Sequence, residues 1–382
     1  MDFSLSDETK ALRDAAREFA EREIKPHAAY YDEQQEFPRD TVRKLGELGF
    51  MGILVPEEYG GAGLTYVDYV AIVEEISAAD ASLGITVAAH NSLCTNHILL
   101  FGSEAQKRKY LPDLASGRKL GAWGLTENSA GSDAGGTRTT AVLSADEWIV
   151  NGSKTFTTHG TVGDVAVFVA VTRPGLGHRG ISAFVVERGT PGFRAGKKEN
   201  KLGHRASDTA ELIFDMCSLP AENLIGEEGS GFSDCLKVLD GGRISIAALG
   251  LGIARAAYEA ALEYSKVREQ FGQPIANFQA VRILLADMHA RIEASRALIY
   301  RAACLKDAGQ RATRESAMAK VHAGETAVKV ANDAIQIHGG YGYTKDYPVE
   351  RYYRDSKLIT IGEGTSEIQR LVIARTLLRP TA

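Results

Sequence analysis

The sequence predicts an α+β protein with two or three domains. Helical periodicity marks residues 1–120 and 227–382, whereas residues 121–226 contain short β-branched and aromatic runs separated by Gly, Pro and Asn. A chain of 382 residues is long enough for that number of domains, each with its own core. We therefore expect an N-terminal helical domain over 1–120, a middle β-domain over 121–226 and a helical domain over 227–382.

The first domain is expected to consist of short helices. Ser6 precedes two acidic residues and an amphipathic stretch, a pattern that predicts a capped helix start. Residues 69–76 and 106–111 fit two further helices, and breaks occur at Pro38, Pro56 and the glycine-rich turn 60–63. The N-terminus shows no signal-peptide or transit-peptide pattern, so we expect a cytoplasmic, bacterial protein rather than a mitochondrial precursor.

The middle domain is expected to contain at least six strands. Each candidate is rich in β-branched or aromatic residues and is bounded by turn-forming residues. The candidate strands are 122–126, 139–143, 148–150, 165–171, 181–186 and 211–214.

Long helices are predicted for the last part of the chain. Apolar residues recur there at spacings of three and four, which predicts one buried stripe made of Phe278, Val281, Leu285, Met288 and Ile292. A second apolar set repeats at seven: Val321, Val328 and Ile335. Alanine-rich stretches containing Gly250 and Gly252 would let neighbouring backbones approach closely, so an antiparallel helical bundle is expected.

Composition argues against several classes of function. Hydrophobic residues make up 44% of the chain and charged residues 24%, as in an ordinary globular protein. The net charge of −5 lacks the basic footprint of a nucleic-acid-binding protein. The longest uncharged apolar stretch, 244–254, is too short to cross a bilayer, so no membrane insertion is expected. No strand-linked G-x-G-x-x-G and no P-loop occur, so neither a Rossmann nicotinamide site nor a P-loop is indicated.

The cysteine and histidine patterns predict no metal site. Four widely separated cysteines form no C-x-x-C pair and are expected to be reduced and mostly buried: Cys94, Cys217, Cys235 and Cys304. Nine histidines form no H-E-x-x-H. His90 and His97 lie two helical turns apart, but core or surface roles are favoured over metal ligation.

A glutamate between two glycines is the strongest candidate for chemistry. Residues 361–370 read Ile-Gly-Glu-Gly-Thr-Ser-Glu-Ile-Gln-Arg, and Ser366 and Gln369 have the spacing of a capping box at a helix start. Glycines let a ligand approach the backbone closely, so Glu363 could stand against a bound substrate. Taken alone, the segment is more simply a solvated loop.

Three further segments combine small, hydroxyl-bearing or cationic residues. Residues 123–133 read Trp-Gly-Leu-Thr-Glu-Asn-Ser-Ala-Gly-Ser-Asp, a strand entering a loop whose N–H groups and hydroxyls suit a flat ring or a phosphate. Residues 154–158 read Lys-Thr-Phe-Thr-Thr and offer an aromatic face. Residues 240–243 read Asp-Gly-Gly-Arg and supply a permanent cation. Each is also compatible with an ordinary turn, a core aromatic or a solvated arginine.

Taken in order, these segments resemble the acyl-CoA dehydrogenase flavoprotein family, and the resemblance covers essentially all 382 residues. It leans towards short-chain and branched-chain members. The resemblance implies an N-terminal helical domain, a middle β-barrel and a C-terminal four-helix bundle. It also implies FAD as the cofactor, an acyl-CoA thioester as the substrate, an electron-transfer flavoprotein as the acceptor, and a homotetramer built as a dimer of dimers.

The resemblance assigns roles to individual residues. Glu363 stands where the family has the base that removes the α-proton, while FAD accepts a hydride from Cβ to leave trans-2-enoyl-CoA. Substrate contacts are implied for Ser132, Asp240, Arg243, Gly364 and Arg375. FAD contacts are implied for Trp123, Leu125, Thr126, Gly131, Ser132, Phe156, Thr157, Thr158, Arg268, Phe271, Phe278, Gln279, Gln336, Ile337, Gly339, Gly340, Thr365, Ser366 and Glu367. Of these, the segment 268–279 resembles the part that reaches FAD from a neighbouring subunit.

Several positions depart from the family pattern. Phe156 stands where Trp is usual, and Asn-Ser at 128–129 replaces Pro-Gly, which leaves the path of that loop open. Gly362 replaces an aromatic residue, which should widen the pocket near Cα and Cβ and predicts tolerance of branched or bulky acyl groups. Gly242 occupies the position where some family branches carry their base, so Glu363 is left as the family-type base.

Two other functions stay open at this point. One is a related flavin oxidase that passes electrons to oxygen, which peroxide formation without another acceptor would reveal. The other is a non-catalytic flavin or acyl-CoA binding protein on the same scaffold. The intact Glu363 argues against the second, since a binding protein needs no base.

Overall fold

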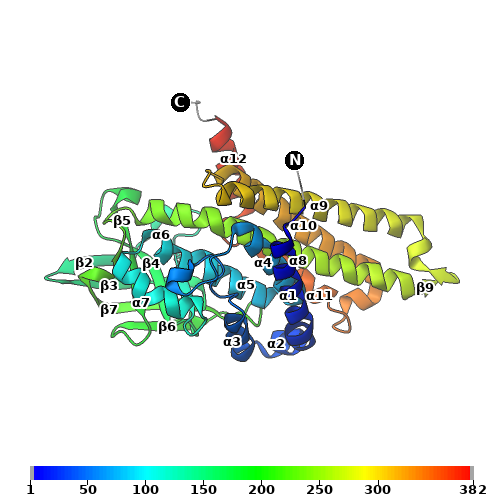
Figure 1. Cartoon of the computed structure of the whole chain (residues 1–382), viewed down its shortest axis with the longest axis horizontal. Helices are drawn as coiled ribbons and strands as arrows, with labels where there is room; N and C mark the ends of the chain where they lie inside the picture. The colour runs from blue at the N-terminus through cyan, green and yellow to red at the C-terminus, as the bar shows by residue number, and fades with distance from the viewer. Residues whose placement is uncertain (1–3, 379–382) are drawn as a thin grey trace.

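In the computed structural model, which describes residues 4–378, a β-rich end and a long helical bundle are joined through a layer of shorter helices (Figure 1). The shorter helices come from the N-terminal part: α1 (Asp7–Phe19), α2 (Ala28–Gln34), α3 (Arg39–Glu47), α4 (Tyr66–Ala79), α5 (Ala81–Ala89), α6 (Asn96–Phe101) and α7 (Glu104–Ala115). The predicted cap of the first helix is confirmed, because the Ser6 hydroxyl accepts a hydrogen bond of 3.1 Å from the Thr9 N–H. The predicted helices at 69–76 and 106–111 lie inside α4 and α7.

The middle part forms one eight-stranded sheet. Its strands are β1 (Gly121–Gly124), β2 (Thr140–Ser144), β3 (Glu147–Thr158), β4 (Val165–Val171), β5 (Ile181–Glu187), β6 (Phe193–Lys198), β7 (Thr209–Pro220) and β8 (Leu224–Ile225). The hydrogen-bonded path runs β6-β7-β3-β2-β4-β5-β8, and β1 pairs with β4 in parallel. Within residues 4–378 no pairing joins β6 to β8, so the path is open at both ends.

The strand predictions were best where the sequence was continuously apolar. β4 has the predicted bounds because almost all of its residues are buried. β3 and β7 extend well beyond 148–150 and 211–214, since polar residues alternate with buried ones along them. β6 was not predicted; its charged, partly exposed residues lack an alternating apolar pattern.

Five helices follow: α8 (Gly231–Val267), α9 (Gln279–Asp307), α10 (Thr313–His338), α11 (Val349–Ile359) and α12 (Ser366–Leu378). A small hairpin of β9 (Glu269–Gln270) and β10 (Gln273–Pro274) joins α8 to α9. α10 packs on α8, α9, α11 and α12, so the predicted bundle is confirmed. The limits 1–120, 121–226 and 227–382 fall between α7 and β1 and between β8 and α8, and we propose them as the domain limits.

Burial confirms the first predicted stripe only in part, since Phe278 and Val281 are half-buried. Leu285, Met288 and Ile292 of the first stripe are buried in α9 as expected. The heptad set of Val321, Val328 and Ile335 is only half-buried, because alanines of α10 occupy the fully buried face and allow the helices to approach closely. The expectation that the cysteines are mostly buried is confirmed, since Cys304 alone of the four is exposed.

The apolar stretch 244–254 lies inside α8, the one helix within residues 4–378 that is long and apolar enough to cross a membrane. An 18-residue window of α8 has a mean hydropathy of 1.3, but 78% of that window is buried inside the structure. α8 packs against α4, α5, α9 and α10, which explains the hydropathy as that of a core helix.

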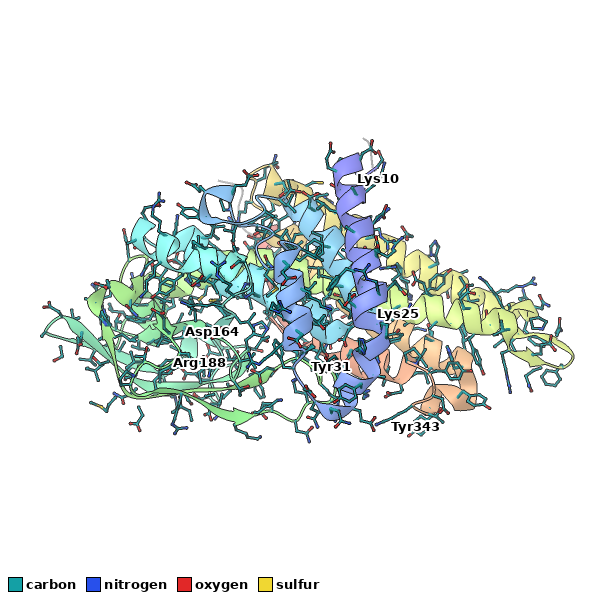
Figure 2. The ribbon with its side chains drawn as sticks, turned by 60° about the horizontal axis from the view of Figure 1, so that its bottom comes forward. Lys10, Lys25, Tyr31, Asp164, Arg188 and Tyr343 are labelled. Carbon is teal, nitrogen blue, oxygen red and sulfur yellow. The ribbon has the colours of Figure 1, made fainter. Side chains whose placement is uncertain are left out.

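A buried histidine joins the three parts of the chain. The side chain of His204 lies 3.1 Å from the Ala81 carbonyl oxygen in the N-terminal part and 2.9 Å from the Asp355 carbonyl oxygen on α11. The backbone N–H of His204 donates to the Asp355 carboxylate at 2.6 Å. In Figure 2, α1 crosses the bundle, with Asp164 and Arg188 of the β-rich end to one side and Tyr343 of the bundle to the other.

Candidate active site

The loop between α11 and α12 holds Glu363 in an unusual backbone conformation. Glu363 has φ of +52° and Gly364 has φ of +92°, a region that favours glycine and is costly for a residue with a side chain. The Gln369 side-chain amide donates to the carbonyl oxygens of Glu363, at 3.1 Å, and Gly364, at 3.0 Å. The Lys320 ammonium donates to the Gly364 carbonyl at 2.5 Å. These three hydrogen bonds stabilise the loop in this conformation.

The predicted capping box at the start of α12 is wrong. The Ile368 N–H donates to the Thr365 hydroxyl at 3.3 Å, so Thr365 caps the helix. Ser366 is the first helical residue, and its hydroxyl is buried without a hydrogen-bond partner. Gln369 is buried and bonds the loop carbonyls instead of reaching back to a cap, because tertiary contacts outweigh the local pattern.

The Glu363 carboxylate lies in a water-poor position against α8. Its Oε2 is buried and has no hydrogen-bond partner. Burial raises the pKa of Glu363 to about 7, although the nearby cations Lys320 and Arg243 oppose the shift. A Cβ added at Gly242 would lie 2.2 Å from Oε2, so only glycine at that position leaves room for the carboxylate. Gly242 thus lies directly beside the Glu363 carboxylate.

Arg243, which is buried, and Asp240, which is half-buried, form an ion pair on α8. An Arg243 guanidinium nitrogen donates to Asp240 at 2.7 Å, and the other Asp240 oxygen accepts from the Thr313 hydroxyl at 2.6 Å. The Nε atom of Arg243 is buried without a partner. The pair therefore lies near Glu363 with one donor free, and its predicted contact with the CoA part of a substrate remains a proposal.

The strand-to-loop segment after β1 borders the same region. The Trp123 indole donates to His97 at 3.1 Å, which explains His97 as a buried partner. The Thr155 N–H donates to the Thr126 carbonyl at 2.8 Å, and Leu125 and Thr126 are half-buried. Residues 127–130 form a tight turn with mutual backbone hydrogen bonds of 3.0 Å between its ends, which settles the path of Asn128-Ser129. Gly131 and Ser132 follow on the exposed loop.

A buried ion pair, which the sequence did not reveal, holds this segment. Lys154 and Glu127 are almost completely buried, with their charged atoms 2.6 Å apart. Glu127 also accepts from the Thr137 hydroxyl and from the N–H groups of Arg138 and Thr139. Burial opposes ionisation of Glu127, but Lys154 and these donors lower its pKa to about 2.

Phe156 and its neighbours at the end of β3 are the second group of predicted flavin-facing residues. Phe156 has φ of +53° and is 65% exposed, unlike an ordinary core aromatic. The hydroxyls of Thr155 and Thr157 are buried without partners, and Thr158 is half-buried. An exposed aromatic face beside unpaired hydroxyls fits a flat hydrogen-bonding ring such as the FAD isoalloxazine.

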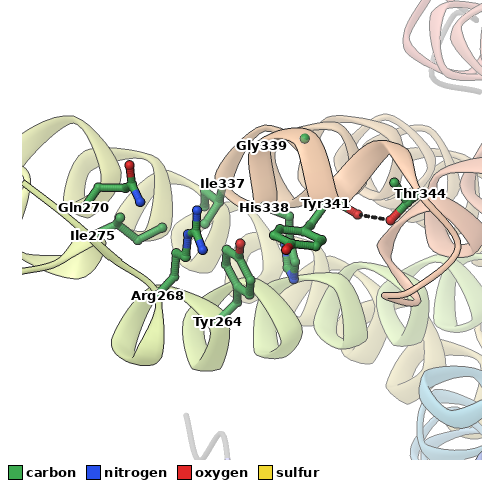
Figure 3. Close-up of a pocket in the computed structure, with 10 residues that line it drawn as sticks. Tyr264, Arg268, Gln270, Ile275, Ile337, His338, Gly339, Tyr341 and Thr344 are labelled. Atoms are coloured by element: carbon green, nitrogen blue, oxygen red, sulfur yellow. Dashed lines mark hydrogen bonds between the residues drawn. The ribbon is translucent and has the colours of Figure 1, made fainter.

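The predicted FAD residues between Arg268 and Gly340 lie at the far end of the bundle. A cavity of about 480 Å³ is lined there by Arg268, Ile337, Gly339 and Gly340, among others (Figure 3). The Arg268 guanidinium lies 5.7 Å from the centre of the Tyr341 ring. Gly339 and Gly340 have open space around the position of a Cβ, so a ligand phosphate can approach their backbone. Phe271, Gln279 and Gln336 are exposed, and Phe278 is half-buried.

Within one chain, the region around Glu363 and the cavity beside Arg268 lie far apart. At about 1.5 Å of rise per residue, α8 alone separates Arg243 from Arg268 by roughly 38 Å. Thr365, Ser366 and Glu367 lie with Glu363, since they open α12, and Glu367 is exposed. Arg375 is exposed near the end of α12.

Comparison with protein families shows which family the chain belongs to. Models of the acyl-CoA dehydrogenase N-terminal, middle and C-terminal domains match residues 6–118, 122–217 and 229–378. The chain belongs to the acyl-CoA dehydrogenase family. Members of this family are FAD flavoproteins, and the unpaired hydroxyls, exposed Phe156 face and open glycines fit that cofactor.

Similar proteins include short-chain enzymes. The chain is 50% identical to the "Acyl-CoA dehydrogenase, short-chain specific" of Clostridium acetobutylicum, over 99% of this chain and 100% of that protein. The structure of butyryl-CoA dehydrogenase from Megasphaera elsdenii matches with a TM-score of 0.98 and 45% identity, covering 99% of this chain and 100% of that one. A structure from work on the electron transferring flavoprotein of Acidaminococcus fermentans and flavin-based electron bifurcation matches with a TM-score of 0.98 and 50% identity, covering 99% and 100%.

Proposed function

We propose that the protein dehydrogenates a short acyl-CoA thioester to its trans-2-enoyl-CoA, with Glu363 as the α-proton base. The observation that carries the proposal is the Glu363 carboxylate, which has a buried, unpartnered oxygen and a pKa of about 7. A base is most effective when its pKa lies near the working pH, where it is both ionised and basic. The butyryl-CoA and short-chain relatives support the substrate class.

Removal of the α-proton needs help from the surrounding groups, because a carboxylate is a much weaker base than the enolate it would form. Within residues 4–378 the Glu363 N–H donates to no protein acceptor, so it is free to donate to the thioester oxygen as negative charge develops there. An acyl chain against Glu363 would exclude water. This would make the carboxylate more basic and strengthen the hydrogen bond from the Glu363 N–H to the thioester oxygen. FAD, when bound, supplies the acceptor for the hydride that leaves Cβ.

We place FAD between two copies of the chain. Phe156, Thr158 and Thr126 of one copy would hold the ring, and Arg268 and Gln279 of a second copy would hold the phosphates. The distance along α8 supports this arrangement, since Arg268 lies roughly 38 Å along the helix from Arg243, which is close to Glu363. We propose the homotetramer, a dimer of dimers, from the family resemblance, and a site shared by two copies is compatible with it.

The proposed electron acceptor is an electron-transfer flavoprotein. The relative from work on such a protein supports this choice. A cytoplasmic, bacterial setting agrees with relatives from Clostridium and Bacillus. Release of peroxide in air at the rate of substrate oxidation would instead indicate the oxidase alternative.

Anaerobic absorbance of the FAD-loaded protein tests the proposal. We expect butyryl-CoA to bleach the flavin band within one turnover and octanoyl-CoA to do so far more slowly. Isobutyryl-CoA and 2-methylbutyryl-CoA complete the set, since they report tolerance of branching. Protein that binds FAD but is bleached by none of the four would indicate the non-catalytic alternative and contradict the proposal.

Gly362 is proposed to allow branched acyl groups beside Glu363. A Cβ at this position would make only ordinary contacts, the nearest at 3.6 Å from Leu358, so Gly362→Tyr is expected to fold. The added ring should reduce kcat/KM for 2-methylbutyryl-CoA by roughly 10-fold or more relative to butyryl-CoA, since a crowded pocket discriminates by about 1–3 kcal/mol. Steady-state kinetics with both substrates measures the ratio, with Gly362→Ala as the small-side-chain control. An unchanged ratio in Gly362→Tyr would remove Gly362 from the determinants of specificity.

A further inference from the structure

We propose that Lys320 is a positioning residue for the base: its ammonium group holds the Glu363 loop through the Gly364 carbonyl and places a positive charge beside the carboxylate. The inference rests on the proposed role of Glu363 as the base. It assigns a function to a residue of α10 that carries none of the predicted roles.

Lys320 is buried to an unusual degree. Its side chain has 0% exposure and lies on the face of α10 that also buries Ala317 and Ala319. Within the described residues its one hydrogen bond goes to the Gly364 carbonyl, at 2.5 Å, and it forms no salt bridge. Burying an ammonium group in such surroundings costs several kcal/mol unless nearby groups compensate it. The position of Lys320 therefore calls for a partner charge.

The Glu363 carboxylate is that partner, although the two groups make no direct bond. Lys320 is the stronger of the two cations that lower the pKa of Glu363, and Glu363 in turn favours the charged form of Lys320. Because Oε2 of Glu363 stays free of hydrogen bonds, the attraction stabilises the carboxylate without blocking it. A direct salt bridge would instead occupy the oxygen that must take the proton.

The other charged groups around Glu363 do not substitute for Lys320. Arg243 on α8 is engaged by Asp240 at 2.7 Å, so its charge is largely balanced. Tyr69 on α4 is a neutral phenol, since burial raises its pKa strongly. Glu367 on α12 is exposed and acts on Lys320 rather than on Glu363. Lys320 is therefore the unbalanced positive charge at the base.

Lys320 also determines the geometry of the loop. Glu363 and Gly364 both have positive φ, and the Gly364 carbonyl accepts from Lys320 and from Gln369. A strained loop persists only where its surroundings hold it from several sides. Loss of one donor should allow the carboxylate to leave its position near the substrate.

The arrangement predicts a narrow pH range of activity. The Glu363 carboxyl must be ionised, which requires a pH above its pKa of about 7. Lys320 must be protonated, and burial lowers its pKa to about 8. The profile of kcat/KM should therefore rise near pH 7 and fall near pH 8, with each limb belonging to the coupled pair rather than to one residue.

Two neutral variants test the inference. Lys320→Met removes both the charge and the donor, whereas Lys320→Gln keeps a donor for the Gly364 carbonyl. We expect the acid limb of both variants to move up by about one pH unit, since an opposite charge at this range shifts a pKa by about 1–3 units. The alkaline limb should disappear, and kcat should fall further in Lys320→Met than in Lys320→Gln. Lys329→Met is the control, because Lys329 lies on the same helix but pairs with Asp333.

A second measurement follows Glu363 without turnover. Infrared spectra of the FAD-loaded protein report the carboxylic acid C=O stretch, and Glu363→Gln identifies the part of that signal due to Glu363. We expect the acid form to persist to higher pH in both Lys320 variants than in Lys329→Met. If the acid limb and the infrared titration of either Lys320 variant match those of the control, the inference about Lys320 is overturned, whereas the proposed function is not. Full turnover in Glu363→Gln would instead overturn the proposed function, and the inference with it.

Discussion

Glu363→Gln is expected to keep FAD and acyl-CoA binding but to lose at least about 10³-fold in dehydrogenation, within the range that a general base contributes. The amide has the same shape as the carboxylate but cannot accept the α-proton. Because burial of the carboxylate is unfavourable, the variant should be no less stable than the parent. Anaerobic single-turnover bleaching of the flavin by butyryl-CoA measures the rate, and ligand-induced changes in the flavin spectrum measure binding.

The matched control is Glu325→Gln, which removes an exposed carboxylate on α10 that pairs with Arg370. This control should bleach at the parent rate. A Glu363→Gln protein that bleaches equally fast would show that another group removes the proton. Gly242 has no side chain and cannot act as a base, so such a result would point away from both family positions.

Lys154→Met is expected to lower the free energy of unfolding by about 3–5 kcal/mol, the usual cost of leaving a buried charge without its partner. The Glu127 carboxylate would remain almost fully buried beside Met, held only by the Thr137 hydroxyl and two N–H groups. Urea unfolding at fixed FAD concentration, followed by tryptophan fluorescence, measures the change.

The dependence of the unfolding free energy on acidic pH should distinguish the contribution of the ion pair from that of packing. The pKa of Glu127 is about 2 in the folded protein and lies near 4.3 for an ordinary glutamate, so the pair stabilises the fold fully above about pH 4.3 and loses this contribution as the pH falls towards 2. Lys154→Met should lack that part of the acid dependence, and the double variant Lys154→Met/Glu127→Gln should recover much of the lost stability. A single variant with the parent's stability at pH 7 would contradict the prediction.

The prediction of the fold was accurate where burial produces a clear apolar pattern in the sequence or where local hydrogen bonds fix the structure. The β4 run at 165–171 was located to the residue because a strand buried on both faces must be continuously apolar. Ser6 and the helix that it caps depend only on local hydrogen bonds. β6 and the full length of β3 could not be located, because their residues show no such pattern.

The candidate site was only partly predictable. Glu363 was predicted as the base because glycines flank it and because the other motifs of the chain resemble those of the family. Lys320 did not, although a lysine in the apolar run 317–321 could have indicated a buried charge. The Ser366–Gln369 capping box was a sound local prediction that failed because Gln369 is buried and bonds the loop carbonyls.

Local periodicity predicted an α+β protein with two or three domains. The α–β–α order, the candidate base Glu363 and the FAD residues came from the resemblance of its ordered motifs to the family. The folded structure was needed to show which charges meet. It placed Lys320 and Arg243 beside Glu363, paired Lys154 with Glu127, and separated Arg268 from Arg243 by roughly 38 Å along α8. Electrostatic effects depend on distance and burial in space, and neither quantity is encoded in the spacing of residues along the chain.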